Sequence, residues 1–252
     1  MPYGNHPELP VFVGEMPLDV HAPGCYTSQA EMKRYNRRNE QLADAAERSA
    51  VIADWMGAVP YPKEALNDAW KRFLWHQFHD DLTGTSIWEA YTYSWNDEFL
   101  AQGQFCDVIL ASAGAAASVM DTRAKGSPVL VYNPAAYSRR SLVEATVDLP
   151  AEAEGVAVYA PDGKTVPAQI VARDGARATV LFAAAMEPVS YAVYDVRAGK
   201  AGKGKVLRAS GNTLENRVYK VTLDANGDIA SVIDKRNGRD LVEKAVSYTH
   251  LR

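Results

Sequence analysis

The sequence predicts a multi-domain α+β protein, in which an antiparallel three-helix bundle is followed by all-β, sandwich-type modules. Residues 28–122 repeat apolar side chains at helical spacing, with Gly and Pro interrupting them. From residue 128 onward the apolar period becomes two, and turn signals separate short segments. A polar corner at residues 75–86, between two helical segments, concentrates the residue types that active sites use.

Composition excludes some classes of function. The 252 residues are 47% hydrophobic, enough for a sizeable core, and the net charge of -4 gives no basic field for nucleic acid. Cys25 and Cys106 form neither a disulfide framework nor a zinc knuckle, and we expect both to be packed. The sequence has no apolar run of transmembrane length and no pattern typical of a signal peptide. It indicates neither a compartment nor an oligomeric state.

Shifts in composition divide the chain into five predicted segments. We expect the Pro- and Gly-rich residues 1–27 to be the tail of a preceding α/β domain, and 28–122 to be the helix bundle. Residues 128–198 are expected to form a small β domain, and 206–245 the start of a truncated β-sandwich. Residues 246–252 resemble a translated sequencing adapter and are set aside.

The first helix is predicted to begin at Ser28, an N-cap candidate with Glu31 three residues later, and to end at Gly57. Pro60 and Pro62 prevent its continuation. The predicted buried face consists of Tyr35, Leu42, Ala45, Ala46, Ile52, Trp55 and Met56.

The second helix is predicted to start at Pro62 and to end near His79, before Thr83 and Gly84. Its apolar stripe comprises Leu66, Ala69, Trp70, Phe73, Leu74 and Phe78. The third helix is predicted to start with Ser86 as N-cap and Glu89 three residues on. Its predicted buried side comprises Ile87, Tyr91, Trp95, Phe99, Phe105, Ile109 and Ala113.

The strands are predicted from alternation and turn residues. In the first β unit they cover residues 129–132, 142–147, 156–159, 170–172, 178–182 and 191–196. A Gly/Lys spacer at 198–205 precedes a second unit, read as a single hairpin of 218–223 and 229–233. One hairpin alone is marginally stable, so this unit is expected to be incomplete.

The corner permits two interpretations on its residues alone. His79, predicted at a helix C-terminus beside Asp80, offers an imidazole and a carboxylate to a divalent metal such as zinc, and His76 lies three residues back. Alternatively, His79 caps the helix while Asp80 and Thr83 satisfy backbone groups in the turn. The spacing alone favours the second interpretation.

The longer pattern carries a family resemblance. Residues 77–86, Gln-Phe-His-Asp-Asp-Leu-Thr-Gly-Thr-Ser, resemble the corresponding corner of the glycoside hydrolase family 38 α-mannosidases. Residues 26–40 resemble the segment that leads into the three-helix domain of that family, and 129–134 are similar to the first strand of its β region. Residues 214–241 resemble the start of its large β-sandwich. These matches follow one another in the family's order.

The resemblance implies a zinc-dependent retaining glycosidase that hydrolyses terminal α-mannosides. It places one zinc ligand on His79 and contacts to sugar hydroxyls on Asp80; it gives no role to Asp81, and His76 is read as structural. The nucleophile, the acid/base carboxyl and the other zinc ligands belong to a preceding α/β domain in that family. The fragment alone is therefore expected to be inactive, and the adjacent Asp80 and Asp81 are a poor catalytic pair.

Two other functions stay open. The β unit would be the binding part of a non-catalytic carbohydrate-binding or structural module if Tyr132, Tyr137 and Tyr159 formed an exposed groove. We expect these tyrosines to pack instead. In a stand-alone metal protein the ligands would be His76, His79, Asp80 and Asp81.

Overall fold

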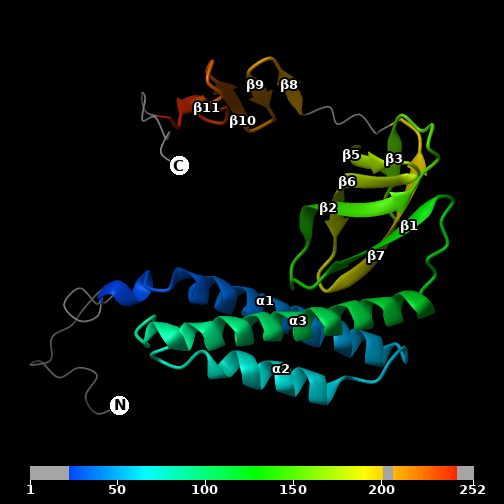
Figure 1. The fold of residues 1–252 in the computed structure, drawn as a ribbon. Coiled ribbons are helices and arrows are strands. Elements are labelled where there is room, and N and C mark those ends of the chain that lie inside the picture. The colour runs from blue at the N-terminus through cyan, green and yellow to red at the C-terminus, as the bar shows by residue number, and fades with distance from the viewer. Residues whose placement is uncertain (1–22, 201–206, 243–252) are drawn as a thin grey trace, which may run out of the picture. The chain divides into compact units, whose positions relative to one another are not determined.

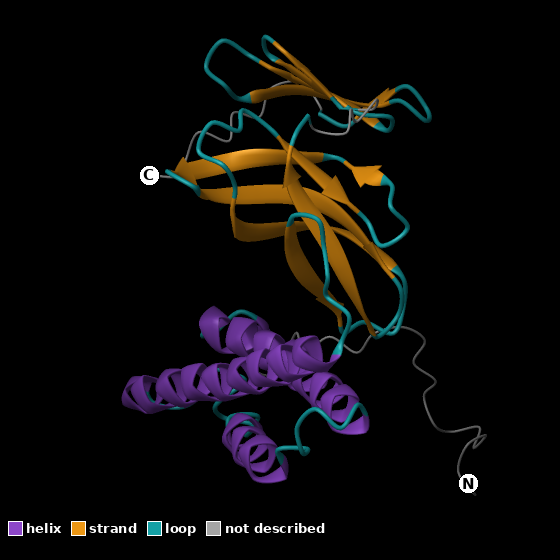
Figure 2. Cartoon of the chain, turned by 90° about the vertical axis from the view of Figure 1, so that its right-hand side faces the viewer, coloured by secondary structure: helices purple, strands orange, loops and turns teal. Residues whose placement is uncertain are grey.

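The structure, a computed structural model, describes residues 23–200 and 207–242 (Figure 1). A 3₁₀ helix, Pro23–Tyr26, precedes α1 (Ala30–Trp55), α2 (Lys63–Trp75) and α3 (Trp88–Val119), and the described strands follow. Figure 2 shows the helices in purple and the strands in orange. This order confirms the predicted fold class, helices packed together followed by antiparallel sheets. The predicted tail at 246–252 and most of the predicted segment 1–27 lie outside the described residues.

The chain forms two compact units. The first holds the three helices together with Tyr132–Arg139 and Met186–Tyr191, and the second holds Arg123–Val131, Arg140–Ala185 and the residues from Ala192 onward. The domain boundaries proposed from the sequence stay a prediction.

The predicted start of the first helix is wrong in its detail. α1 begins at Ala30 after Gln29, which has a left-handed φ of 49°, and no side chain caps the helix. The Ser28 hydroxyl instead donates a hydrogen bond to the Gly84 carbonyl at 3.0 Å. A tertiary contact 56 residues away has therefore taken the hydroxyl that local capping would use.

The ends of the helices around the corner also differ from prediction. α2 ends at Trp75 and not near His79, so His76 occupies the C-cap and His79 lies in the turn beyond it. α3 begins at Trp88 after Ile87, and Ser86 does not cap it through its side chain. The corner is consequently a turn of about a dozen residues between two helices, longer than the sequence pattern indicated.

The bundle core lies where α3 packs on α1 and α2. Alanines of α1 allow close approach of the backbones, and Trp70, Phe73 and Phe105 form mutual edge-to-face and tilted ring contacts of 5.8 to 6.5 Å. The cluster of buried hydrophobic residues at the core consists of Ala43, Ala46, Ala50, Leu66, Ala69, Phe73, Ala101, Phe105 and Val108.

Several aromatic and aliphatic residues predicted to be buried are exposed. The prediction was wrong for six of them: Trp55, Leu74, Phe78, Ile87, Trp95 and Phe99. Helical periodicity assigns these residues to the apolar face, but the packing of the three helices leaves them between 38% and 86% exposed. None of the described helices is long and apolar enough to cross a membrane.

The two short segments of the first unit pack on α1. The Tyr132 hydroxyl donates to the Ala45 carbonyl at 3.3 Å, and Arg48 donates to the Pro134 carbonyl at 2.9 Å. The Tyr132 ring stacks on Tyr191 at 4.7 Å, and burial raises the pKa of both phenols. Tyr132 is thus a packing residue, as expected.

The second unit is built from strands in three sheets. Their bounds are β1 (Ser127–Asn133), β2 (Arg139–Asp148), β3 (Val156–Tyr159), β4 (Thr165–Val166), β5 (Ala168–Asp174), β6 (Arg177–Met186), β7 (Ser190–Ala198), β8 (Arg208–Ser210), β9 (Thr213–Glu215), β10 (Tyr219–Leu223), β11 (Ile229–Asp234) and β12 (Arg239–Asp240). The sheet orders are β1-β7-β3-β4, β2-β6-β5 and β12-β11-β10-β9-β8.

The predicted strands of the first β unit are all present, and β3 has the predicted bounds. The single hairpin expected beyond the spacer was wrong, because β10 and β11 lie within a five-stranded sheet. The sequence pattern missed β8, β9, β12 and β4, which have only two or three residues each and so show no measurable period.

Candidate functional site

The corner between α2 and α3 forms a tight turn centred on His79 and Asp80. The Asp81 amide donates to the Phe78 carbonyl at 3.0 Å, which closes a β-turn with His79 and Asp80 as its two central residues. The Asp80 carbonyl accepts hydrogen bonds from the amides of Thr85 and Ser86, at 3.0 and 2.9 Å. The backbone that carries the His79 and Asp80 side chains is therefore held by hydrogen bonds on both sides.

A tyrosine of α3 completes this bracing. The Tyr91 hydroxyl donates to the Asp80 carbonyl at 3.1 Å and accepts from the Ser86 amide at 3.1 Å. Burial raises the pKa of Tyr91, so the phenol stays protonated and able to donate. The buried Tyr91 side chain therefore connects the turn to the N-terminal part of α3.

The two central side chains face solvent. The His79 side chain is 77% exposed and its Nε2 lies 3.4 Å from Asp80 Oδ2. Asp80 Oδ1 accepts a hydrogen bond from the Thr85 hydroxyl at 2.8 Å, and the Phe78 ring lies beside the imidazole with 4.2 Å between centroids. The candidate zinc ligand and the candidate sugar-binding carboxylate are adjacent, oriented by neighbours and accessible.

Asp81 has the opposite environment. It is buried, and the Ser94 hydroxyl, a single donor, lies 2.8 and 2.9 Å from its two carboxylate oxygens. His76 Nδ1 lies 2.6 Å from Asp81 Oδ2, while His76 Nε2 lies 3.1 Å from Asp97 Oδ2. Arg72 donates to the other Asp97 oxygen at 2.7 Å. Two adjacent aspartates thus serve different purposes, one at the surface and one inside.

The sequence reasoning missed Asp97, Ser94 and Arg72. A signal existed: Ser94 and Glu98 lie on the buried side of α3, and polar residues on an apolar helix face require partners. Glu98 is fully buried with Asn39, which donates to both its side chain and its carbonyl. Burial raises the pKa of Glu98 to about 7.

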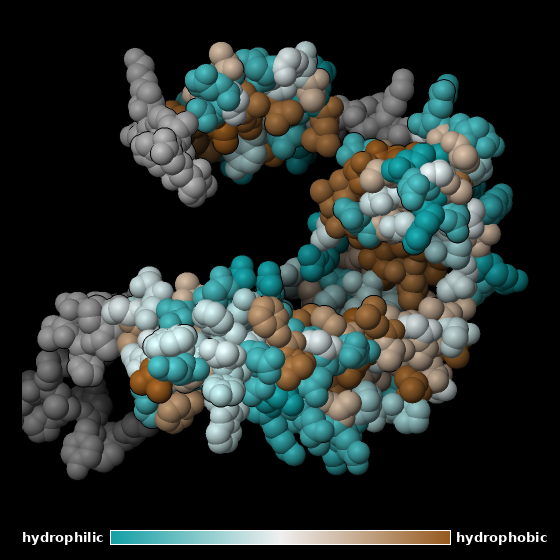
Figure 3. Space-filling view, in the orientation of Figure 1, coloured by the Kyte–Doolittle hydropathy of each residue, from teal (hydrophilic) through white to brown (hydrophobic). Residues whose placement is uncertain are grey.

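Apolar side chains are exposed on both sides of the corner. A hollow of about 240 Å³ is lined by Trp75, Phe78 and Asp81, and Ile87 and Trp88 are more than 70% exposed. The surface of the helices in Figure 3 accordingly shows hydrophobic patches interspersed with hydrophilic ones. Large exposed aromatic groups beside polar, oriented side chains are typical of surfaces that bind something.

Comparisons with known proteins agree with this geometry. Residues 21–113 match the family described as the alpha mannosidase middle domain, a segment that contains the whole corner. The chain carries an α-mannosidase middle domain. The resemblance of the sequence to the middle domain of glycoside hydrolase family 38 α-mannosidases is therefore confirmed.

Alpha-mannosidases of other organisms match the chain over different lengths. The alpha-mannosidase 2C1 of Mus musculus is 26% identical over 242 residues, 93% of this chain. The alpha-mannosidase of Saccharomyces cerevisiae is 37% identical over 91 residues, 34% of this chain and 8% of its own length. The chain spans about a fifth of the length of the mouse relative.

Solved structures share the fold. The crystal structure of an alpha-mannosidase from Enterococcus faecalis V583 superposes with a TM-score of 0.68 and 21% identity, and the match covers 87% of this chain and 29% of that one. A second Enterococcus faecalis structure, described as a protein in the glycosyl hydrolase family 38, gives the same TM-score and covers 31% of its chain.

The donor set of the corner fits part of a zinc site. An imidazole and a carboxylate are ligand types that zinc prefers, and His79 offers an accessible ring nitrogen. Within residues 23–200 and 207–242, no three His, Cys, Asp or Glu side chains form a group that could hold a metal. Both ring nitrogens of His76 contact carboxylates, so the alternative set of His76, His79, Asp80 and Asp81 does not assemble.

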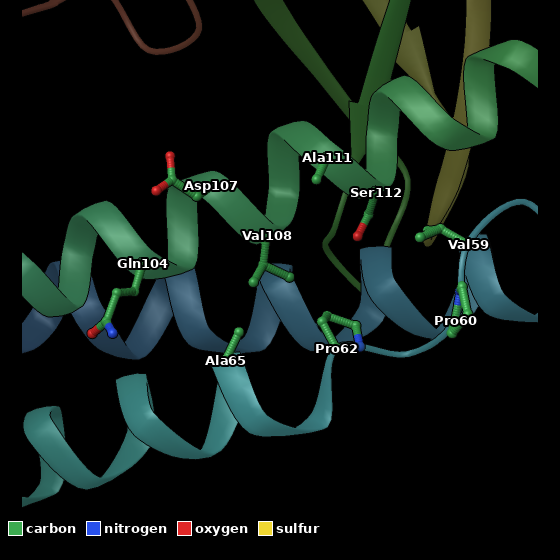
Figure 4. A pocket seen from close by; sticks show the side chains of 9 residues that line it. All are labelled: Val59, Pro60, Pro62, Ala65, Gln104, Asp107, Val108, Ala111 and Ser112. Carbon is green, nitrogen blue, oxygen red and sulfur yellow. The ribbon is translucent and has the colours of Figure 1, made fainter.

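A separate pocket lies along the bundle, away from these residues in sequence. It has a volume of about 300 Å³ and is lined by Val59, Pro60, Pro62, Ala65, Gln104, Asp107, Val108, Ala111 and Ser112 (Figure 4). Figure 4 shows Val108 and Ser112 pointing from α3 toward the start of α2. Asp107 is the one titratable group among these lining residues, so the pocket lacks a pair of groups for acid–base chemistry.

The tyrosines of the carbohydrate-module alternative do not share one groove. Tyr132 is half-buried against Tyr191, and the Tyr159 ring lies under the Arg197 guanidinium at 4.1 Å. Tyr137 is 66% exposed, so the expectation that it packs was wrong. Tyr159 and Tyr132 are therefore occupied by contacts within the chain. The corner is the stronger candidate site.

Proposed function

We propose that this chain provides the middle-domain part of the active site of a zinc-dependent retaining α-mannosidase that hydrolyses terminal α-mannosides of glycans. The single observation that supports this most strongly is the placement of His79 and Asp80 at the exposed centre of a braced turn. They occupy the positions to which the family resemblance assigns a zinc ligand and a sugar-binding carboxylate.

His79 would hold the metal through its exposed ring. Its neighbour Asp80 lies 3.4 Å away, which favours a positioned imidazole at this surface. When bound, zinc would supply a Lewis acid for hydroxyl groups of the sugar. The remaining ligands would come from a part of the enzyme other than the described residues, because one imidazole does not complete a tetrahedral site.

Asp80 would bind the sugar. A carboxylate accepts up to about four hydrogen bonds, and Thr85 uses one of these positions on Oδ1. The free positions face solvent and can accept hydroxyl groups of a mannose ring. The rigid backbone at Asp80 lowers the entropic cost of holding that geometry.

The covalent chemistry would be performed elsewhere in the enzyme. Retaining glycosidases use two carboxyl groups about 5–5.5 Å apart across the scissile bond. Asp81, the nearest carboxylate in sequence, is buried and bound by Ser94 and His76, so it is a poor nucleophile. We therefore propose no catalytic nucleophile or acid in this chain.

A chimera tests the proposal. The matching segment of the Saccharomyces cerevisiae alpha-mannosidase is replaced by residues 23–122 of this chain, and zinc content and hydrolysis of a p-nitrophenyl α-mannoside are measured. We expect a folded chimera to retain both. His79→Ala should lose zinc and activity together, whereas Asp80→Asn should keep zinc and lose at least about a hundredfold in kcat/KM.

A matched control separates the site from the fold. Glu89→Gln alters an exposed side chain in the first turn of α3, outside the corner motif, and we expect unchanged zinc content and activity. If the His79→Ala chimera keeps full zinc and activity while remaining folded, the metal role of the corner is wrong. Glycan binding by the chain alone, without zinc, would instead favour the carbohydrate-binding module.

A further inference from the structure

His76 lies in the interior of the corner, between the turn and α3. Its side chain is 5% exposed, and its ring nitrogens contact two different carboxylates, Asp81 Oδ2 at 2.6 Å and Asp97 Oδ2 at 3.1 Å. An ionised carboxylate only accepts hydrogen bonds. Both ring nitrogens must then donate, which makes the ring an imidazolium.

The surrounding charges balance this assignment. Arg72 donates to Asp97 at 2.7 Å, so two cations face the carboxylates of Asp81 and Asp97. Glu98 lies nearby and is the remaining acid of this buried cluster. Burial raises the pKa of Glu98 to about 7, so the carboxyl is mostly protonated below that pH. Buried charges persist when they are paired in this way.

The bridge acts on the functional turn through Asp81. The Asp81 amide closes the β-turn around His79 and Asp80, and its side chain is held by His76 and Ser94. The other end of the bridge is Asp97 on α3, a long helix that is fixed by the bundle core. The turn is therefore attached to the scaffold by a charge-assisted hydrogen bond on each side of one ring.

We propose that His76 is a positioning residue for His79 and Asp80, a doubly protonated ring that ties their turn, through Asp81, to Asp97 of α3. The inference rests on the proposed function, because positioning matters only if His79 binds a metal and Asp80 binds a sugar. His76 itself touches neither substrate nor metal in this account.

The protonation state is tested by nuclear magnetic resonance of the full chain with ¹⁵N-labelled histidine, at neutral pH and without metal. We expect two ring N–H signals from His76 that exchange slowly with water, absent in His76→Gln. In Asp97→Asn, which keeps the shape of the side chain, the Nε2 proton should exchange faster while the Nδ1 proton persists. A single protonated ring nitrogen would overturn the proposal.

The positioning role is tested by amide hydrogen exchange in the same chain. We expect His76→Gln to speed exchange of the Asp81, Thr85 and Ser86 amides by about tenfold, the loss typical of a charge-assisted hydrogen bond. Exchange at the Val108 amide in the core should stay the same. Uniform acceleration across α3, or no change in the turn, would show that His76 does not position the corner.

A double variant distinguishes loss of the His76 contacts from misfolding of the chain. His76→Gln combined with Asp81→Asn restores a neutral donor and acceptor, and it should slow the turn amides relative to His76→Gln alone. Since no metal is present, failure of these measurements overturns the positioning role and leaves the chimera result standing. An inactive, metal-free chimera together with two His76 N–H signals overturns the proposed function alone.

Discussion

The hydroxyl of Ser28 donates a hydrogen bond to the carbonyl of Gly84 at 3.0 Å, and so joins the start of α1 to the turn before α3. Gly84 has a φ of +84°, and a Cβ atom there would lie 2.7 Å from the carbonyl oxygen and the hydroxyl of Ser28. Only glycine fits this contact without a shift in backbone.

Gly84→Ala should therefore destabilise the helical unit by about 2 kcal/mol or more, from the left-handed backbone and the clash together. Urea unfolding followed by circular dichroism measures the change. Gly103→Ala is the matched control, because Gly103 lies inside α3 with nothing within 4 Å of an added Cβ. That variant should gain about 0.5–1 kcal/mol, and a loss at both positions would contradict the argument.

Glu98 should make stability depend on pH. Its pKa is raised from 4.5 to about 7 by burial, so the folded chain binds more protons than the unfolded chain between these values. The contribution of Glu98 to the free energy of unfolding is therefore highest below pH 4.5. This contribution falls by about 3 kcal/mol as the pH rises from 4.5 through 7.

Glu98→Gln removes this dependence. We expect the variant to be more stable than the parent at pH 8 and similar at pH 5, when both are unfolded in urea at each pH. A parent chain whose stability does not fall relative to Glu98→Gln between pH 5 and pH 8 would show that the carboxyl is ionised throughout.

Zinc should bind the isolated chain weakly. His79 supplies a single ligand of the proposed site, so we expect a dissociation constant above about 10 µM. Zinc should broaden the ring signals of His79, and His79→Ala should remove this response. Sub-micromolar binding that is lost in His76→Ala would contradict both the incomplete site and the buried bridge.

Two phenylalanines of the same region should differ in their contribution to stability. Phe73 is 1% exposed at the centre of the core, and Phe73→Ala should cost about 3–5 kcal/mol. Phe78 is 55% exposed, so Phe78→Ala should change the free energy of unfolding by less than about 0.5 kcal/mol. Urea midpoints of the two variants measure the difference.

Sequence patterns predicted the helices because each presents a long apolar face. They failed at helix ends, where the prediction depends on one side chain and its local bonds. Ser28 had the features of an N-cap, yet its hydroxyl contacts Gly84, and nothing in the spacing of either residue indicates the other. Ser86 likewise precedes α3 without capping it.

The sequence pointed only to the exposed half of the candidate site, and the roles of its residues stay a prediction. His79 and Asp80 were found through resemblance, whose motif they carry, and their accessible placement is what a ligand and a sugar contact require. The buried half depends on Asp97 and Ser94, which lie in the next helix. Contacts of this kind form through packing, so a linear pattern around His76 could not indicate them.

The corner holds two imidazoles three residues apart in contrasting surroundings, one enclosed by carboxylates and one open to solvent. An acylating reagent directed at histidine would therefore label position 79 first and reach position 76 only after the bundle opens. The rate at which position 76 is labelled relative to position 79 therefore reports how often this region opens. Mass spectrometry measures both rates without substrate or metal.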